Sequence, residues 1–301
     1  MKEFKVKFTG VIAVLAYCLA LPLAAQEKAV VASTNLHSLW KVEGKSNTVY
    51  LMGSIHLLKP DNFPLAPALE TAFSNAQVVA FETDIEKMSD PQTQMKLLGK
   101  AQLPEGETLK QHLTAETYAG FVSHAKDSGV PLPMLESMKP SMAAMVLSVV
   151  EVTKLGADPE NGLDKYFNGK ARKAGKEVIG LETVDFQIDM VTGFSKDEED
   201  AMMKSALKDL DQLKQKYGEI VAAWQVGNSV AIEKFLNESM VQEPTIYKRL
   251  ITDRNKSWIP KIEELGSGGK NAIVIVGAGH LVGKEGVVEL LKKKGLKVTQ
   301  L

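Results

Sequence analysis

The feature that most constrains the fold is a strand signature that occurs twice, near opposite ends of the chain. In each copy a short apolar run leads into Gly-x-x-His: residues 48–52 precede Gly53-Ser54-Ile55-His56, and residues 272–276 precede Gly277-Ala278-Gly279-His280. Apolar runs of this length that stop at a glycine predict buried strands. Two such strands in one sheet would deliver both imidazoles to its edge, so the two ends of the chain are predicted to share one site.

The N-terminal residues predict an export signal. Three lysines among the first seven residues precede an apolar run over residues 11–23, which is the layout of a secretory signal peptide. The run is too short to span a membrane. We therefore expect cleavage after Ala25, which makes residues 1–25 the signal peptide and leaves an exported, periplasmic or secreted protein without a stable membrane span. The single cysteine, Cys18, lies in this segment, so the mature chain would have no thiol nucleophile.

Length and charge narrow the classes of function. Residues 26–301 are long enough for one domain with a large core, and no Pro/Ser-rich linker divides them, so a single bilobed domain is predicted. Cleavage would remove three lysines and one glutamate, which lowers the formal net charge from -1 to -3. This slightly acidic balance, without a basic run that contains aromatic residues, argues against a nucleic-acid partner.

The remaining patterns predict a mixed α/β fold. Further strands are predicted at residues 39–43, 78–81, 177–181 and 296–299, and separate helices at residues 66–75, 163–174 and 284–294. Two long helical blocks follow the second and third of these strands, at residues 88–155 and 195–265, and Ser195-x-x-Glu198 is a capping box for the second block. We expect a mostly parallel central sheet with two large helical insertions.

Four predicted strands end in side chains that can do chemistry: His56, Glu82, Glu182 and His280. Ligands bind outside the carboxyl ends of strands in sheets of this kind, so we expect the four to lie together. Two imidazoles and two carboxylates suit a divalent ion such as zinc, manganese or cobalt, with positions left for water. Bound metal would activate that water for hydrolysis. The same groups could also work without metal, with a histidine as general base and a glutamate that orients it.

Each candidate also has a structural alternative. A lone histidine after a strand is often a satisfied cap or surface residue, and Glu82 and Glu182 could cap helices. Arg254, one turn before Trp258, suits a surface cation-π pair or a clamp on a carbonyl or carboxylate. Signatures of other chemistries fail, because residues 277–283 match neither a dinucleotide fingerprint nor a phosphate loop, and no Gly-x-Ser-x-Gly elbow occurs.

At these residues the chain resembles the TraB/GumN family, which includes the animal TIKI proteases and many exported bacterial proteins. The resemblance extends from Leu39 to the C-terminus. Its most specific parts are the two Gly-x-x-His motifs, Phe81-Glu82, Gly162-Leu163-Asp164, Gly180-Leu181-Glu182-Thr183 with Gln187, and Arg254-Asn255. The family is similar in fold to the erythromycin esterase and ChaN-like proteins, which have an α/β sheet with helical insertions.

The resemblance implies a metal-dependent peptidase in which His56, His280 and Glu82 hold manganese or cobalt. Glu82 is then a ligand or the general base, Arg254 contacts the substrate or transition state, and Glu182 orients a ligand. We therefore expect an exported metal-dependent hydrolase that acts on a peptide or protein. The fold relatives leave two alternatives, because ChaN-like proteins bind haem and erythromycin esterases use histidine and glutamate. These alternatives are a non-catalytic haem- or peptide-binding protein and a metal-independent esterase.

Overall fold

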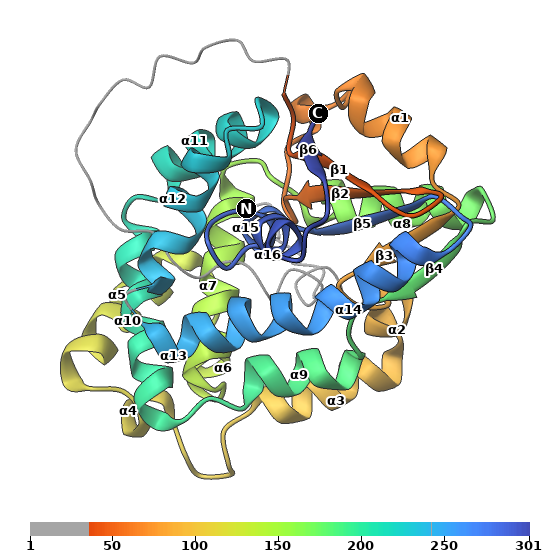
Figure 1. Ribbon diagram of the computed structural model, residues 1–301. Coiled ribbons are helices and arrows are strands. Elements are labelled where there is room, and N and C mark those ends of the chain that lie inside the picture. Colours follow the sequence, from red (N-terminus) through yellow and green to blue (C-terminus); the bar gives the residue numbers. More distant parts are fainter. Residues whose placement is uncertain (1–35, 242) are drawn as a thin grey trace.

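A six-stranded sheet forms the centre of the protein, with helices packed around it (Figure 1). The computed structural model describes residues 36–241 and 243–301, so the predicted signal peptide, residues 1–25, lies outside the described residues. Across those two ranges, no helix combines the length and the apolar character needed to cross a membrane.

The sheet is mixed and mostly parallel, as predicted. Four neighbouring strands run in parallel, in the order β4 (Glu177–Gly180), β3 (Val78–Phe81), β5 (Ala272–Gly277) and β2 (Thr48–Ser54). The antiparallel strand β1 (Leu39–Glu43) lies between β2 and β6 (Val298–Gln300). Every residue of β3 and β5 is buried, as expected of parallel strands that are covered on both faces.

The strand from the far end of the chain lies in the middle of the sheet. Helix α1 (Pro67–Asn75) connects β2 to β3, and these two strands are parallel, but they are not neighbours because β5 lies between them and pairs with both. The arrangement places the two Gly-x-x-His strands side by side, with Ser54 opposite Gly277.

The two helical insertions leave the sheet after β3 and after β4, as predicted. The first contains α2 (Ile85–Ser89), α3 (Pro91–Ala101), α4 (Leu109–His112), α5 (Ala115–Ser128), α6 (Leu132–Glu136), α7 (Pro140–Lys154), the short η4 (Pro159–Asn161) and α8 (Leu163–Lys173). The second contains α9 (Val184–Thr192), α10 (Lys196–Leu210), α11 (Leu213–Gln225), α12 (Ser229–Val241), α13 (Pro244–Tyr247), the π-helical η5 (Lys248–Thr252) and α14 (Asp253–Ser267).

The insertions pack against each other beside the sheet. Helix α7 lies against α10, and α3 lies along α9 (Figure 1). Nearly all of α7 is buried, as is typical of a helix that is apolar all round. The predicted capping box begins α10, since Ser195 Oγ accepts from the backbone N–H of Glu198 at 3.3 Å and Glu198 Oε2 accepts from the Ser195 N–H at 2.8 Å.

Three short elements complete the chain: η3 (Pro60–Asn62) after β2, and α15 (Ala278–Leu281) and α16 (Val287–Lys293) after β5. The predictions differ from the structure in three places. The C-terminal helix begins at Val287 rather than at residue 284, the terminal strand spans Val298–Gln300 rather than residues 296–299, and α9 was not predicted.

The two motif-bearing strands approach closely at Gly53. A Cβ atom added at Gly53 would lie 3.1 Å from both the Cα and the Cβ of Ala278, in the second motif. The Gly53 carbonyl also accepts from Trp224 Nε1 at 2.7 Å, which holds this backbone from the other side. A side chain at Gly53 would therefore press on Ala278, the first residue of α15.

We expect Gly53→Ala to lower the free energy of unfolding by about 1–3 kcal/mol, because it overpacks this contact. Gly99→Ala in α3 is the matched control, since nothing lies within 4 Å of an added Cβ there and alanine suits a helix interior better than glycine. Urea denaturation measures both. Equal stability of the two variants would contradict the close contact at Gly53.

Candidate active site

The carboxyl ends of the four parallel strands meet at one edge of the sheet. Strands β2 and β5 are in register at Ser54 and Gly277, and β3 lies between β5 and β4 with Phe81 at its end. Four predicted site residues follow these strand ends: His56, Glu82, Glu182 and His280.

Arg254, in the first turn of α14, is fully buried and joins three of these strand ends. Its Nη2 donates to Glu82 Oε2 at 2.5 Å and to Glu182 Oε2 at 2.9 Å, and its Nε donates to Glu182 Oε1 at 2.9 Å. Its Nη1 donates to the Leu250 carbonyl at 3.2 Å and to His280 Nε2 at 3.0 Å. The guanidinium therefore has a protein acceptor for each of its N–H groups.

The ion pairs keep Arg254 and Glu82 charged. Burial alone would lower the pKa of Arg254, but Glu82 and Glu182 outweigh it and raise the pKa. Burial alone would raise the pKa of Glu82, but Arg254 and the other surrounding groups lower it to about 2. One of these groups is the Gly277 N–H, which donates to Glu82 Oε1 at 2.8 Å and so joins the end of β5 to the carboxylate.

Glu182 is held by a second set of donors. Trp258 Nε1 donates to Glu182 Oε1 at 3.0 Å, and Gln187 Nε2 lies 3.2 Å from Glu182 Oε2 and 3.5 Å from Glu82 Oε2. The Glu182 side chain is only 4% exposed. The carboxylate is surrounded by protein donors, so in this arrangement Glu182 positions Arg254.

His280 is buried and neutral. Its Nδ1 lies 2.6 Å from Asn255 Oδ1, and the Asn255 amide is oriented by its Nδ2, which donates to the Glu285 carbonyl at 2.8 Å. Nδ1 therefore carries the proton, and Nε2 accepts from Arg254. Burial, reinforced by the Arg254 charge, lowers the pKa of His280 to about 3.

His56 has a different partner and the opposite charge state. Its Nδ1 lies 2.5 Å from Asp164 Oδ2, while Asp164 Oδ1 accepts from Ser54 Oγ at 2.8 Å. Burial alone would lower the pKa of His56, but Asp164, followed by Glu82, outweighs it and raises the pKa to about 9. The His56 side chain is 11% exposed, whereas His280 is sealed from solvent. His56 is thus the more exposed imidazole of the pair, although its Nε2 atom is itself buried.

Helix α8 delivers Asp164 because its N-terminus packs on the motif loop. The Leu163 N–H donates to the Ile55 carbonyl at 3.0 Å. A Cβ atom at Gly162 would lie 2.3 Å from the His56 carbonyl oxygen, so only glycine fits between the helix and the loop. This close approach places Asp164, in the first turn of α8, beside the His56 ring.

The chain matches one protein family over most of its length. A model of the TraB/PrgY/gumN family matches residues 38–300. The chain belongs to this family. The resemblance seen in the sequence is confirmed, and the site lies within the region that the TraB/PrgY/gumN family shares.

Two relatives carry the name Uncharacterized protein YbaP. One is from Escherichia coli strain K12 and the other from Shigella flexneri, and each is 26% identical to this chain over 248 residues. The match covers 81% of this chain and 87% of each relative. No solved structure matches the chain.

The metal ion predicted on His56, Glu82 and His280 does not fit the present arrangement of this TraB-family site. The His280 Nε2 lone pair, which would bind the ion, accepts from Arg254, and Glu82 Oε2 accepts from the same guanidinium. Within residues 36–241 and 243–301, no three His, Cys, Asp or Glu side chains are grouped so that they could hold a metal. An ion at this position would require Arg254 to leave, so the metal ligands stay a prediction.

Two of the structural alternatives are wrong: neither glutamate caps a helix, and Arg254 does not form a surface pair. The residues that cap α2 and α9 are Asp84 and Thr183, rather than Glu82 and Glu182. Arg254 does lie over the Trp258 ring, at 5.0 Å from its centroid, but both residues are completely buried, so this is not a surface pair. Since the guanidinium donates to protein acceptors throughout, its predicted contact with a substrate also stays a prediction.

Three residues that hold the site together were not predicted to do so. Asp164, Gln187 and Asn255 stood in the motifs that carried the family resemblance, yet none was assigned a role. One available signal was the Gly-Leu-Asp sequence of residues 162–164 at a predicted helix start. The helix dipole stabilises a carboxylate in a first turn, and such a carboxylate can accept from an imidazole N–H.

Loss of the buried Arg254 charge should lower the stability of the fold. We expect Arg254→Met to lower the free energy of unfolding by about 3–5 kcal/mol, because it leaves Glu82 and Glu182 buried without their partner. Arg172→Met is the matched control: its side chain is 38% exposed and pairs with surface carboxylates, so about 0–1 kcal/mol is expected. Chemical denaturation compares the two, and similar losses would show that the buried pair has no special weight.

The charge state of His56 can be measured directly. In an NMR titration of the histidine rings, we expect His56 to titrate near pH 9. Asp164→Asn should move this midpoint down, because the main group that raises the pKa is lost while burial remains. Glu160→Gln, an exposed change near the start of α8, should leave the midpoint unchanged.

The same shift predicts how stability depends on pH. Because the folded pKa of about 9 lies above the ordinary value of 6.5, the pair stabilises the fold fully below pH 6.5 and loses this contribution as pH rises through 9. The stability difference between the wild type and Asp164→Asn should narrow over that range. A constant difference would contradict the assignment.

Proposed function

We propose that this TraB-family chain is a hydrolase of peptide or ester bonds in which His56 transfers the proton. The His56–Asp164 pair supports this most directly. A carboxylate bound at Nδ1 fixes the tautomer and orientation of an imidazole, which is the arrangement used for general acid–base catalysis. The pair stands at the carboxyl edge of the sheet, where ligands bind to folds of this kind.

His56 is better suited to proton transfer than its neighbours. Glu82, with a pKa of about 2, and His280, with a pKa of about 3, are weak bases, and Arg254 does not release its proton. Deprotonated His56 is a much stronger base, and Asp164 and Glu82 stabilise the imidazolium that forms. Arg254 and the two glutamates hold the strand ends in place, and their charges keep a fixed position relative to His56.

The reaction follows from these roles. His56 accepts a proton from water as the water oxygen bonds to the carbonyl carbon of the substrate. The imidazolium then gives the proton to the leaving amine or alcohol as the bond to that carbon breaks. Export through residues 1–25 and action on a peptide or protein belong to the same proposal, and they rest on sequence pattern and resemblance.

A metal-dependent hydrolase is the second candidate. The orientation of both rings favours it, because His56 and His280 each have Nδ1 against an oxygen atom, as metal-binding histidines usually do. This candidate requires Arg254 to withdraw from His280. When bound, manganese, cobalt or zinc would supply an activated water.

The test uses the exported protein, chelator-treated, with pools of fluorogenic peptides and nitrophenyl esters. We expect hydrolysis whose kcat/KM rises with pH towards about 9, because the base must lose its proton. His56→Ala and Asp164→Asn should each lower kcat/KM by about 10²–10⁴-fold. Glu160→Gln should retain wild-type activity.

Three other outcomes would redirect the proposal. Activity that appears only on addition of Mn²⁺, Co²⁺ or Zn²⁺ would favour the metal-dependent candidate. Activity that survives His56→Ala would remove His56 from the reaction. No hydrolysis of any substrate pool would leave a haem- or peptide-binding protein, and a haem titration would then separate those two.

A further inference from the structure

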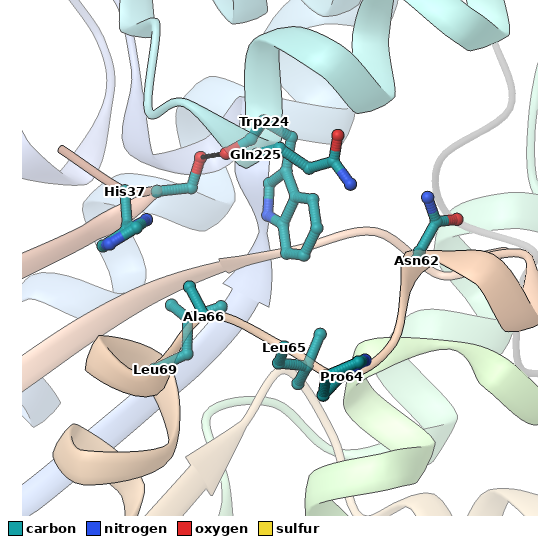
Figure 2. A pocket seen from close by; sticks show the side chains of 9 residues that line it. His37, Asn62, Pro64, Leu65, Ala66, Leu69, Trp224 and Gln225 are labelled. Atoms are coloured by element: carbon teal, nitrogen blue, oxygen red, sulfur yellow. Dashed lines mark hydrogen bonds between the residues drawn. The ribbon is translucent and has the colours of Figure 1, made fainter. Parts of the chain in front are cut away.

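A cavity of about 200 Å³ lies between the end of α11 and the segment that leads into α1 (Figure 2). Its walls come from the segment after β2, from α1, from the residues just before β1 and from the end of α11. The apolar part of the wall consists of Pro64, Leu65, Ala66, Leu69 and Trp224. Among the described residues its lining contains no Asp, Glu, Lys or Arg, and the polar members are His37, Ser38, Asn62 and Gln225.

Trp224 connects this cavity to the first Gly-x-x-His motif. Figure 2 shows its ring extending from α11 toward Leu65 and Pro64, and its Nε1 donates to the Gly53 carbonyl at 2.7 Å. Ser38, which also lines the cavity, accepts from the Gly53 N–H at 2.8 Å and donates through Oγ to the Trp224 carbonyl at 3.0 Å. The cavity wall and the motif therefore form one hydrogen-bonded unit.

Only a short length of chain separates the residue that Trp224 contacts from His56. Gly53 and His56 are three residues apart, so their Cα atoms are separated by at most about 11 Å. A peptide of about three residues covers the same span.

The lining specifies the kind of group that fits. A cavity of 150 Å³ lined by apolar side chains takes up benzene, so about 200 Å³ suits one large apolar side chain. Burial of a charged group against these walls would cost several kcal/mol, because no Asp, Glu, Lys or Arg of the described part of the chain lines them. His37 lies at one end of the cavity in Figure 2, and its Nδ1 is buried without a hydrogen-bond partner among the described residues.

We propose that this cavity is a specificity pocket for a large apolar side chain, such as leucine, methionine or phenylalanine, of a peptide substrate. The proposal rests on the proposed hydrolase function, which it deepens by naming the substrate class. Because Trp224 both lines the pocket and holds Gly53, a bound side chain packs directly against the residue that supports the His56 loop.

Binding, rather than hydrolysis, tests the pocket. The probes are N-acetyl-L-leucine amide and N-acetylglycine amide, which differ only in the side chain, and the readout is the Trp224 indole N–H signal in an NMR titration of the full protein. We expect the leucine compound to shift this signal with an affinity at least about tenfold above that of the glycine compound, as burial of a leucine side chain predicts.

A matched pair of variants localises the effect. Ala66→Leu fills the cavity and should weaken binding of the leucine compound at least about tenfold. Ala119→Leu makes the same change on the exposed side of α5 and should keep the wild-type affinity. Circular dichroism checks that Ala66→Leu is folded, and the comparison of the two compounds on the wild type stands without any variant.

The outcomes separate the two proposals. Equal affinity for both compounds, or no shift of the Trp224 signal, would overturn the pocket whether or not the protein hydrolyses peptides. A selective shift that Ala66→Leu removes would establish the pocket, even if no hydrolysis is found and the proposed reaction fails.

Discussion

The site depends on one buried positive charge. Arg254 lies between Glu82 and Glu182, so a single guanidinium fastens the ends of β3 and β4, and its contact with His280 adds the segment after β5. Buried charges need full pairing, and every N–H of Arg254 has its acceptor. The same charge lowers the pKa of Glu82 against the effect of burial, and it reinforces burial in lowering the pKa of His280.

Topology explains why residues so far apart in the chain cooperate. The strand that precedes His280 enters between β2 and β3, which brings the last part of the chain to the centre of the sheet. The insertions then supply the partners of the strand-end residues: α8 of the first carries Asp164, and α14 of the second carries Arg254 and Asn255. The sheet places the strand-end side chains, and residues of the two insertions influence their protonation.

The sequence allowed the edge to be predicted but not its internal contacts. His56, Glu82, Glu182 and His280 could be placed together because each follows an apolar run and parallel strands share a carboxyl edge. Arg254 could be named but its burial could not, because that depends on how α14 packs against the sheet. Asp164 could not be paired with His56, since their contact depends on a helix start that meets a loop more than a hundred residues away. Helix α9 was not predicted because it begins only two residues after Glu182, with no loop to mark its start.

The repeated motif is symmetrical in sequence and asymmetrical in chemistry. One copy ends in an imidazole beside a carboxylate at the surface of the site, and the other in an imidazole beside an amide in the interior. The Gly-x-x-His motif therefore determines where the imidazole lies but not its protonation state. The surroundings of the two rings set their opposite charge states: Asp164 raises the pKa of His56 against its burial, whereas burial and the Arg254 charge lower the pKa of His280.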